Sequence, residues 1–291
     1  MTVLVRWMLR GTVVPLLAVA SLCAAGSSAL DQASSLYQRT EYEGSLALLN
    51  AIPEKDAPVL ALIGKNQYMM GDYKKASETY QQAVAADPRN SVYENWLGKS
   101  FGKRAESASP FTAPGMASKA RQHFEKAIAL DATNQEAMSD LFEYYLEAPS
   151  FLGGGIDKAT KLAEQIAALD SVEGLWAQSR IAERRKDYGK AEEQLRRAMQ
   201  AAPMQLGRIL DLAKFLSKQG RIDESEQIFK AAEKVAPGSP RLLYARAESY
   251  IKSGRNIDKA RDLLRRYLAA NLSPDDPSRR EALQLLKQAG S

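Results

Sequence analysis

The sequence contains almost none of the side chains that build metal centres and covalent catalytic sites. Its 291 residues include one cysteine, Cys23, and one histidine, His123. One thiol cannot form an intramolecular disulfide, and a single histidine excludes most zinc clusters and most histidine-based triads. We therefore expect no catalytic residue, no metal site and no cofactor, and we interpret His123 as a surface or partly packed side chain on a helix.

The sequence also lacks a phosphate-binding loop and a strong excess of charge. Its one run of three glycines, 153–155, continues as Ile156-Asp157-Lys158, whereas a P-loop follows a strand and ends in Gly-Lys-Ser/Thr. We interpret these glycines as a sharp turn into the next helix. The formal net charge is +5, which is too small over this length to indicate a nucleic-acid partner.

Long apolar runs are confined to the N-terminus. The first ten residues carry two arginines and no acid, residues 12–25 are almost wholly apolar, and small residues follow as far as Ala29. This order is typical of a secretory signal peptide, whereas a transmembrane helix needs about 20 apolar residues. We predict a signal peptide over 1–29, cleaved after Ala29, with Ala25 or Gly26 as alternative cleavage sites.

The predicted signal peptide sets the expected location of the protein. Cleavage would release the chain to the periplasm or the medium, with no stable membrane span left. In the alternative, the apolar N-terminus stays uncleaved and tethers the protein to a membrane. Lipidation at Cys23 is disfavoured, because Leu22 stands where a lipoprotein signal needs a small residue.

A unit of two amphipathic helices recurs through the rest of the chain. In its most regular copy, 57–90, Gly71-Asp72 joins the two apolar-periodic stretches and Asp87-Pro88 ends the second. Small residues, Gly64 and Ala83 among them, lie where the two helices would cross. One helical hairpin cannot bury its apolar face alone, so the unit predicts neighbours.

Six units agree in phase once two insertions are counted. We expect them at about 57–90, 91–134, 135–171, 172–205, 206–239 and 240–272. A degenerate hairpin over 30–56 precedes them and a capping helix within 273–291 follows, because terminal repeats need a polar outer face. For the capping helix we predict Asp276 as the N-cap residue, with Ala282, Leu283 and Leu286 on the buried face.

This pattern resembles the tetratricopeptide repeat family, whose units have Trp, Leu-Gly, Tyr, Ala, Phe and Pro at fixed offsets. The 57–90 unit has at these places Leu60, Ile63-Gly64, Gln67, Ala76, Tyr80 and Pro88, and the 206–239 unit has Ile209, Leu212-Ala213, Leu216, Ser225, Phe229 and Pro237. The family proline is replaced at Ala132, Ser171 and Leu272. The resemblance implies an all-α, right-handed superhelical solenoid that works as a protein-binding scaffold.

The resemblance also implies a concave groove, lined by outward residues of the first helices, that holds a protein or peptide partner. The same residues could equally form a solvated polar face. Some members of the family hold a C-terminal carboxylate with lysine and asparagine side chains of adjacent repeats. Lys65, Asn95 and Lys99 resemble such a clamp only loosely. The candidates for the groove are Lys65, Tyr68, Met69, Asn95, Lys99, Lys103, Glu143, Leu146, Trp176, Arg180, Lys214, Lys218, Tyr244 and Glu248.

The two insertions are the most individual features of the sequence. Residues 102–119 lengthen the second hairpin, and 149–155 enlarge the next hairpin on the same edge. We predict that four apolar residues at their tips form one cluster, which either braces the two loops or meets a partner. These residues are Phe111, Met116, Phe151 and Leu152.

Two classes of function fit these observations. The first is a non-catalytic scaffold for protein–protein interaction in a bacterial cell envelope, acting in envelope assembly or secretion. The alternative is a carbohydrate-binding protein or an enzyme accessory protein of the envelope, with a site on the solenoid. A closed pocket with convergent polar groups would favour the alternative, and an open groove would favour the scaffold.

Overall fold

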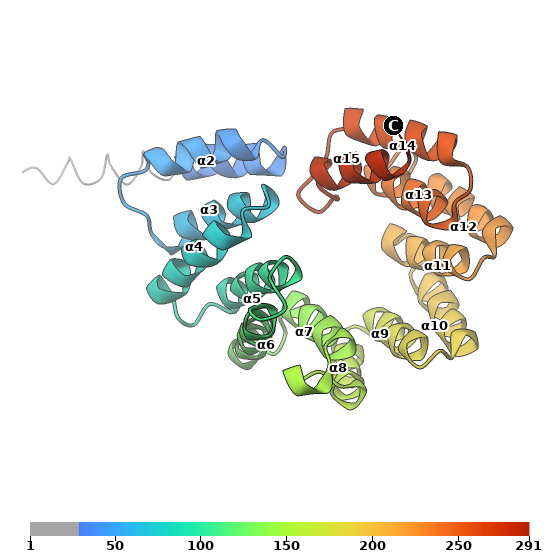
Figure 1. Cartoon of the computed structure of the whole chain (residues 1–291), viewed down its shortest axis with the longest axis horizontal. Coiled ribbons are helices and arrows are strands. Elements are labelled where there is room, and N and C mark those ends of the chain that lie inside the picture. Colours follow the sequence, from blue (N-terminus) through green and yellow to red (C-terminus); the bar gives the residue numbers. More distant parts are fainter. Residues whose placement is uncertain (1–28, 291) are drawn as a thin grey trace, which may run out of the picture.

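The computed structural model describes residues 29–290, and all regular secondary structure in that range is helical. The helices form antiparallel hairpins that stack side by side (Figure 1). The first pairs residues 29–38 with α2 (Tyr42–Ala51). Here the buried hydroxyl of Ser45 donates a 2.8 Å hydrogen bond to the carbonyl of Ala33, which fixes the two helices against each other.

Six longer hairpins follow, and the expected all-α solenoid of helical hairpins is confirmed. None of the described helices is long and apolar enough to cross a bilayer. The hairpins pair α3 (Ala57–Met69) with α4 (Tyr73–Ala86), α5 (Ser91–Glu106) with α6 (Ala113–Leu130), α7 (Gln135–Glu147) with α8 (Ile156–Leu169), α9 (Ser171–Arg184) with α10 (Tyr188–Ala201), α11 (Leu206–Lys218) with α12 (Ile222–Val235), and α13 (Pro240–Ser253) with α14 (Ile257–Ala269).

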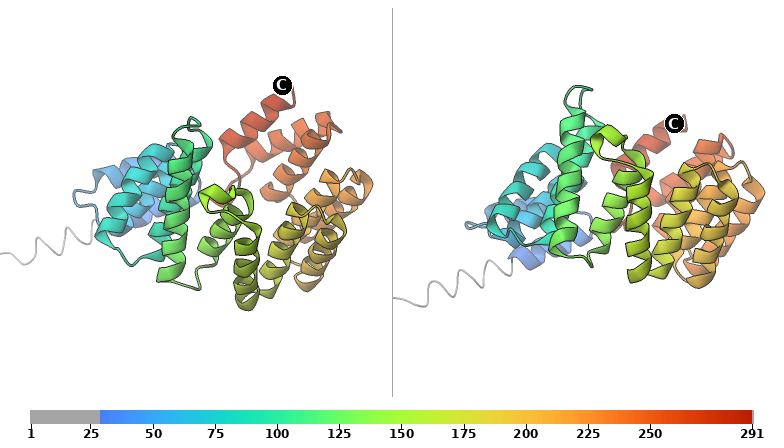
Figure 2. Two further views of the ribbon diagram at one scale, coloured as in Figure 1. Left: turned by 60° about the horizontal axis from the view of Figure 1, so that its bottom comes forward. Right: turned by 90° about the horizontal axis from the view of Figure 1, so that it is seen from below.

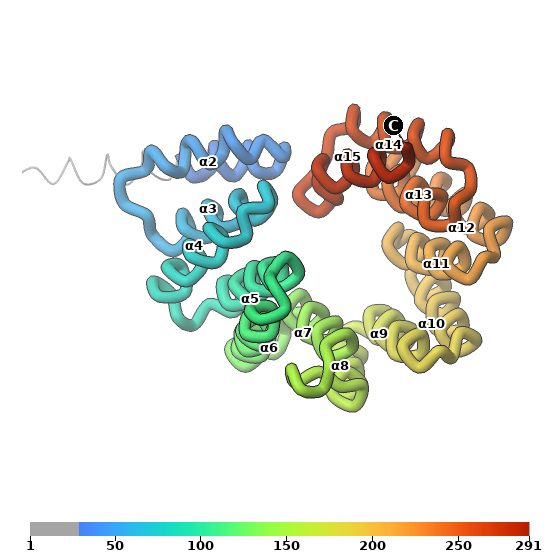
Figure 3. The backbone as a smooth tube through the Cα atoms, in the orientation of Figure 1, coloured from blue at the N-terminus to red at the C-terminus, as the bar shows by residue number. Residues whose placement is uncertain are grey.

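The hairpins curve into a ring with an open centre (Figure 3). The first helix of each hairpin lies toward the centre and the second lies outside (Figure 1). Consecutive first helices contact one another along most of the inner layer, as α3 does with α5 and α5 with α7. The last helix, α15 (Arg279–Gln288), follows α14, and its first residues with the loop before them face α2 and α3 (Figure 1).

Glycines permit the close helix crossings that the sequence predicts. A Cβ on Gly64 would lie 2.7 Å from the ring of Tyr80, and one on Gly98 would lie 2.6 Å from the ring of Phe124. In both hairpins an aromatic ring of the second helix therefore packs directly on the backbone of the first. Tyr80 is fully buried by this contact and Phe124 is 6% exposed.

The third and fourth hairpins meet without a linker. Asp170 is both the C-cap residue of α8 and the N-cap residue of α9, where its side chain accepts from the backbone amides of Val172 and Glu173. A Cβ on Gly174 would clash with that of Ala167, so the two helices touch at their junction. Here the family proline is replaced, and a shared aspartate makes the turn instead.

Most of the first insertion is helical. Its residues lengthen the C-terminal end of α5 and the N-terminal end of α6, which leaves a turn at 107–112. The second insertion forms the short 3-10 helix η1 (Ser150–Leu152). The turn projects beyond one edge of the ring and η1 lies beside it (Figure 2), in contact with α6.

Two predictions for the capping helix are wrong. Its N-cap residue is Ser278, in a capping box with Glu281, while Asp276 accepts instead from the amide and hydroxyl of Ser273 at 2.9 Å. Leu283 is 54% exposed, and Ala282 and Leu285 are buried, because the buried stripe follows i, i+3 spacing. The predicted signal peptide and its tether alternative lie outside the described residues, apart from Ala29.

Candidate partner-binding surface

The inner face of the ring is held together by polar contacts between consecutive first helices. Between α5 and α7, Lys99 Nζ lies 2.6 Å from Glu136 Oε1, and the buried amide of Asn95 donates to Asp140 at 2.9 Å. Burial raises the pKa of Asp140, and Lys99 and Asn95 offset part of that rise. The predicted clamp groups Asn95 and Lys99 therefore already have partners within the protein.

The same arrangement continues between α7 and α9. The guanidinium of Arg180 binds the carboxylate of Glu143 through two hydrogen bonds of 3.0 Å. Hydrogen bonding to Glu143 raises the pKa of Arg180 further above its usual value. One turn on, Arg184 Nε donates to the carbonyl of Leu146 at 3.0 Å. Leu146 itself is 3% exposed, so its prediction as a groove residue is wrong: its side chain belongs to the core.

Looser ion pairs join the C-terminal part of the inner face. Lys218 Nζ lies 2.9 Å from Glu183 across α9 and α11. Lys214 Nζ lies 3.3 Å from Glu248 across α11 and α13. The lysine side chains of these pairs remain 65% and 45% exposed, respectively, so they can still reach a ligand.

Aromatic rings and cations alternate at the N-terminal end of the inner face. Lys65 and Lys99 lie 5.2 and 4.3 Å from the centroid of the Trp96 ring. Tyr68 packs edge-on against the same ring at 5.3 Å. Trp176, further round the ring, has the guanidinium of Arg208 at 5.7 Å. Such cation–π contacts stabilise the lysine and arginine side chains against the faces of the rings.

The other predicted groove residues have mixed surroundings. Met69 packs against the apolar cluster of the first hairpin, Lys103 binds Glu106 of its own helix at 2.9 Å, and Tyr244 packs against Tyr267 at 5.3 Å. All of the predicted residues lie on first helices. The prediction that they contact a partner stays a prediction.

A cavity of 530 Å³ lies on the C-terminal part of the inner face, and we call it the lumen cavity. It lies among α11, α13 and the loop before α15, and groups of both signs line it, including Arg208, Asp211, Arg241, Asp275 and Glu281. Burial raises the pKa of Asp211, although Arg208 lies 3.3 Å away and opposes the rise. The cavity can therefore hold a polar segment with charges of both signs.

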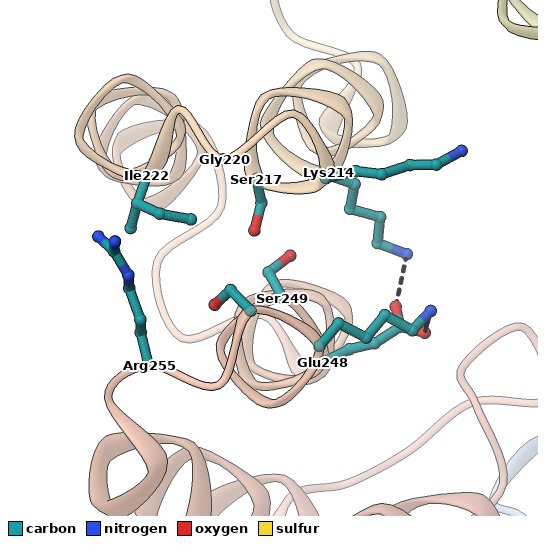
Figure 4. Close-up of a pocket in the computed structure, with 10 residues that line it drawn as sticks. Lys214, Ser217, Gly220, Ile222, Glu248, Ser249 and Arg255 are labelled. Atoms are coloured by element: carbon teal, nitrogen blue, oxygen red, sulfur yellow. Dashed lines mark hydrogen bonds and ion pairs between the residues drawn. The ribbon is translucent and has the colours of Figure 1, made fainter.

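A second cavity, of 430 Å³, lies on the other side of the Lys214–Glu248 pair (Figure 4). It lies between the C-terminal parts of α11 and α13, and we call it the basic pocket. Lys218, Lys252 and Arg255 line it together with three serines. Lys252, in the last turn of α13, and Arg255, just beyond its C-cap residue Gly254, were not predicted from the sequence.

The two ends of the solenoid meet, which was not predicted from the sequence either. Arg280 of α15 donates to the hydroxyl of Tyr73 at 3.1 Å and lies 6.0 Å from the centroid of its ring. A cavity of 270 Å³ lies beside this contact, lined by Tyr42, Met69 and Arg279 among others. We call this junction of the first repeats with the cap the seam.

The predicted loop cluster is exposed rather than packed. The ring of Phe111 is 95% exposed and that of Phe151 is 80% exposed, so neither ring braces the other loop. Met116 and Leu152 are partly buried. Polar groups brace η1 instead: Tyr144 donates to the carbonyl of Leu152 at 2.8 Å. That these exposed tips contact a partner stays a prediction.

The histidine contacts a buried carboxylate. His123 Nδ1 lies 2.7 Å from Glu94 Oε2, and Lys126 Nζ lies 2.5 Å from the other oxygen of Glu94, whose side chain is fully buried. The imidazole stacks on Phe101. Burial alone would raise the pKa of Glu94, but hydrogen bonds from His123 and Lys126 outweigh it and lower the pKa. No cluster of metal-ligating side chains occurs among residues 29–290.

Three models of the tetratricopeptide repeat match the sequence, at residues 57–90, 182–248 and 241–271. Together they cover three of the hairpins and parts of their neighbours. No curated protein matches the chain. The sequence resemblance to tetratricopeptide repeats is thereby confirmed.

Solved structures show the same fold. A thermophilic tetratricopeptide repeat protein of Thermus thermophilus is similar over 66% of this chain and 98% of its own, with a TM-score of 0.55 and 20% identity. A tetratricopeptide repeat protein of Parabacteroides merdae is similar over 92% of this chain and 100% of its own, with a TM-score of 0.59 and 12% identity. At these identities the likeness concerns the fold alone.

Proposed function

We propose that this chain, which is similar to tetratricopeptide repeat proteins, is a non-catalytic scaffold that holds a protein or peptide partner on the inner face of its ring. The observation that carries the proposal is the row of inner helices tied to one another by ion pairs such as Arg180–Glu143. A surface fixed before binding loses little conformational entropy when a partner docks. The fold thus offers a preformed surface rather than a flexible one.

The chemistry of that surface suits an extended polar segment. Exposed lysines at 214 and 218 stand beside the lumen cavity and the basic pocket. Half-buried aromatic rings such as Tyr244 and Trp176 lie on the same face. Aromatic side chains and cations are the groups from which binding hot spots are most often built.

The N-terminal sequence supports an envelope location for this scaffold, in assembly or secretion. Its basic start and short apolar run are those of an export signal. Export is tested by N-terminal sequencing of the protein recovered from the envelope and medium fractions. A chain that starts at Leu30 supports the proposal, and a full-length chain found only in the cytoplasmic fraction contradicts it.

Partner binding is tested by site-specific photo-crosslinking in the source cells. A photoreactive residue is placed at Tyr244 on the inner face and, as a matched control, at Tyr188 on the outer helix α10, where the side chain is 43% exposed. We expect a defined protein adduct from position 244 and none from 188. Purified partner and scaffold must then bind in solution. The same adducts from both positions, or none from either, contradict the proposal.

A further inference from the structure

The basic pocket contains hydrogen-bond donors that have no partner within the protein. Ser217 of α11 and Ser249 of α13 point toward each other across the pocket (Figure 4). In the part of the chain that the structure describes, neither hydroxyl makes a hydrogen bond. Ser249 is only 6% exposed, so its hydroxyl opens onto the pocket rather than onto bulk solvent. A polar group in this position is normally satisfied by a partner.

Cations surround these hydroxyls. Lys214, Lys218, Lys252 and Arg255 line the pocket, whereas Glu248 is its one acidic residue. Lys214 and Lys252 both lie near Glu248, at 3.3 and 2.7 Å. Two cations therefore share one carboxylate, and the pocket keeps an excess of positive charge.

The remaining two cations are freer. Lys218 is 65% exposed and reaches out of the pocket to Glu183 at 2.9 Å. Arg255 makes no ion pair within residues 29–290. Its guanidinium points toward Ile222 at the mouth of the pocket (Figure 4). Both side chains can therefore turn to an incoming anion, because Glu183, which is 12% exposed, keeps Arg180 as a second partner at 3.7 Å.

The spacing of these groups distinguishes an acidic peptide from a single phosphate. Lys214 and Lys218 are one helical turn apart on α11, and Ser249 and Ser253 are one turn apart on α13. A step of four residues along a helix is about 6 Å. Side chains on one face of an extended peptide recur about every 6.7 Å. The two rows therefore match successive acidic side chains of an extended segment, whereas a phosphate would fill one place.

We propose that the basic pocket binds an acidic, extended segment of the partner protein, with successive carboxylates on Lys214 and Lys218, a further one on Arg255, and hydrogen bonds from Ser217 and Ser249. The proposal rests on the scaffold function proposed above and names the chemistry of the segment that is held. It also places that segment between α11 and α13, at the edge of the lumen cavity rather than at its centre.

The test is a calorimetric titration of the purified chain with a short glutamate peptide at low ionic strength, with inorganic phosphate as the comparison ligand. We expect the peptide to bind and phosphate to compete poorly. The double variant Lys218→Gln/Arg255→Gln should weaken binding about tenfold, because two exposed charge pairs are lost. The double variant Ser217→Ala/Ser249→Ala should weaken it about threefold while the net charge stays the same.

The matched control is Lys190→Gln, which removes one exposed cation from the outer helix α10. It should leave the affinity unchanged. An equal loss in this control, unchanged affinity in both pocket variants, or binding of phosphate without the peptide overturns the proposal. If the crosslinks at Tyr244 persist while the glutamate peptide does not bind, the scaffold function stands and only the acidic-segment proposal fails.

Discussion

Arg280 and Tyr73 are 207 residues apart in the sequence, yet Arg280 Nη2 lies 3.1 Å from the hydroxyl of Tyr73. The contact joins the capping helix to the first full repeat and closes the solenoid into a ring. An exposed contact of this kind contributes no more than about 1 kcal/mol. Its effect is therefore on shape more than on global stability.

The first prediction concerns the seam. Arg280→Ala should open the ring, because it removes both the hydrogen bond and the cation–π contact to Tyr73. Small-angle X-ray scattering should show a larger radius of gyration, while the melting temperature changes little. The control is Arg185→Ala, at the C-cap of α9 and outside the seam. An unchanged scattering curve for Arg280→Ala would show that the seam does not hold the ring closed.

The second prediction distinguishes the effect of a substitution on ring closure from its effect on backbone strain. Gly71 has φ +80° and a Cβ there would clash with the guanidinium of Arg280, whereas Gly238 has φ +68° and open space around it. An L side chain in this conformation costs about 1–2 kcal/mol. Gly71→Ala and Gly238→Ala should therefore be destabilised alike in urea unfolding, but only Gly71→Ala should enlarge the ring. Equal scattering curves for the two variants would contradict this.

The third prediction uses two glycines of α5. Gly98→Ala would place a Cβ 2.6 Å from the Phe124 ring, whereas in Gly102→Ala the nearest atom is 4.0 Å away. Overpacking should destabilise the first variant by about 1–3 kcal/mol. The second should be stabilised by up to about 1 kcal/mol, because alanine favours helix over glycine. Urea unfolding measures both, and a shift of the same sign would refute the proposed crossing.

The fourth prediction concerns the buried carboxylate. Glu94→Gln should destabilise the protein at pH 7 by about 1–3 kcal/mol, because Lys126 and the imidazole of His123 lose the buried carboxylate that they contact. Glu193→Gln, at a carboxylate that is 64% exposed, should change stability by less than about 0.5 kcal/mol. Chemical denaturation measures both variants, and equal losses would show that burial of Glu94 is unimportant.

The pH dependence of this effect has a definite sign. The folded pKa of Glu94 lies below its ordinary value of 4.5, so the folded state binds this proton less readily than the unfolded state. The stabilisation by Glu94 is then complete above the ordinary value and is lost as the pH falls through it toward the folded pKa. The stability gap between wild type and Glu94→Gln should therefore shrink on acidification. A gap that is constant from neutral to acidic pH would contradict the assignment.

The local features of the fold were predictable from the sequence because they depend on near neighbours. Gly64 and Gly98 marked the helix crossings, since only a missing side chain admits Tyr80 and Phe124 there. The capping helix was predicted, but its start was misplaced by two residues. Asp276 and Ser278 are both good cap residues, and only the Glu281 side chain, reaching back to Ser278, decides between them.

The site was less predictable, because its contacts cross between units. Lys99 and Arg180 lie on first helices, as expected, but spacing within one helix does not show that Glu136 and Glu143 stand opposite them. Ring closure depends on the sum of small angles at every junction, including the linker-free one at Asp170. Ring closure therefore cannot be predicted from any short stretch of the sequence.

Closure of the ring changes how the repeats depend on one another. In an open stack each terminal unit has a single neighbour and frays independently. Contact between Tyr73 and Arg280 gives the two ends a common boundary, so local opening at one end removes support from the other. Hydrogen-exchange rates at the first hairpin and at α15 should consequently rise and fall together. A ligand bound at either end would slow exchange at both ends.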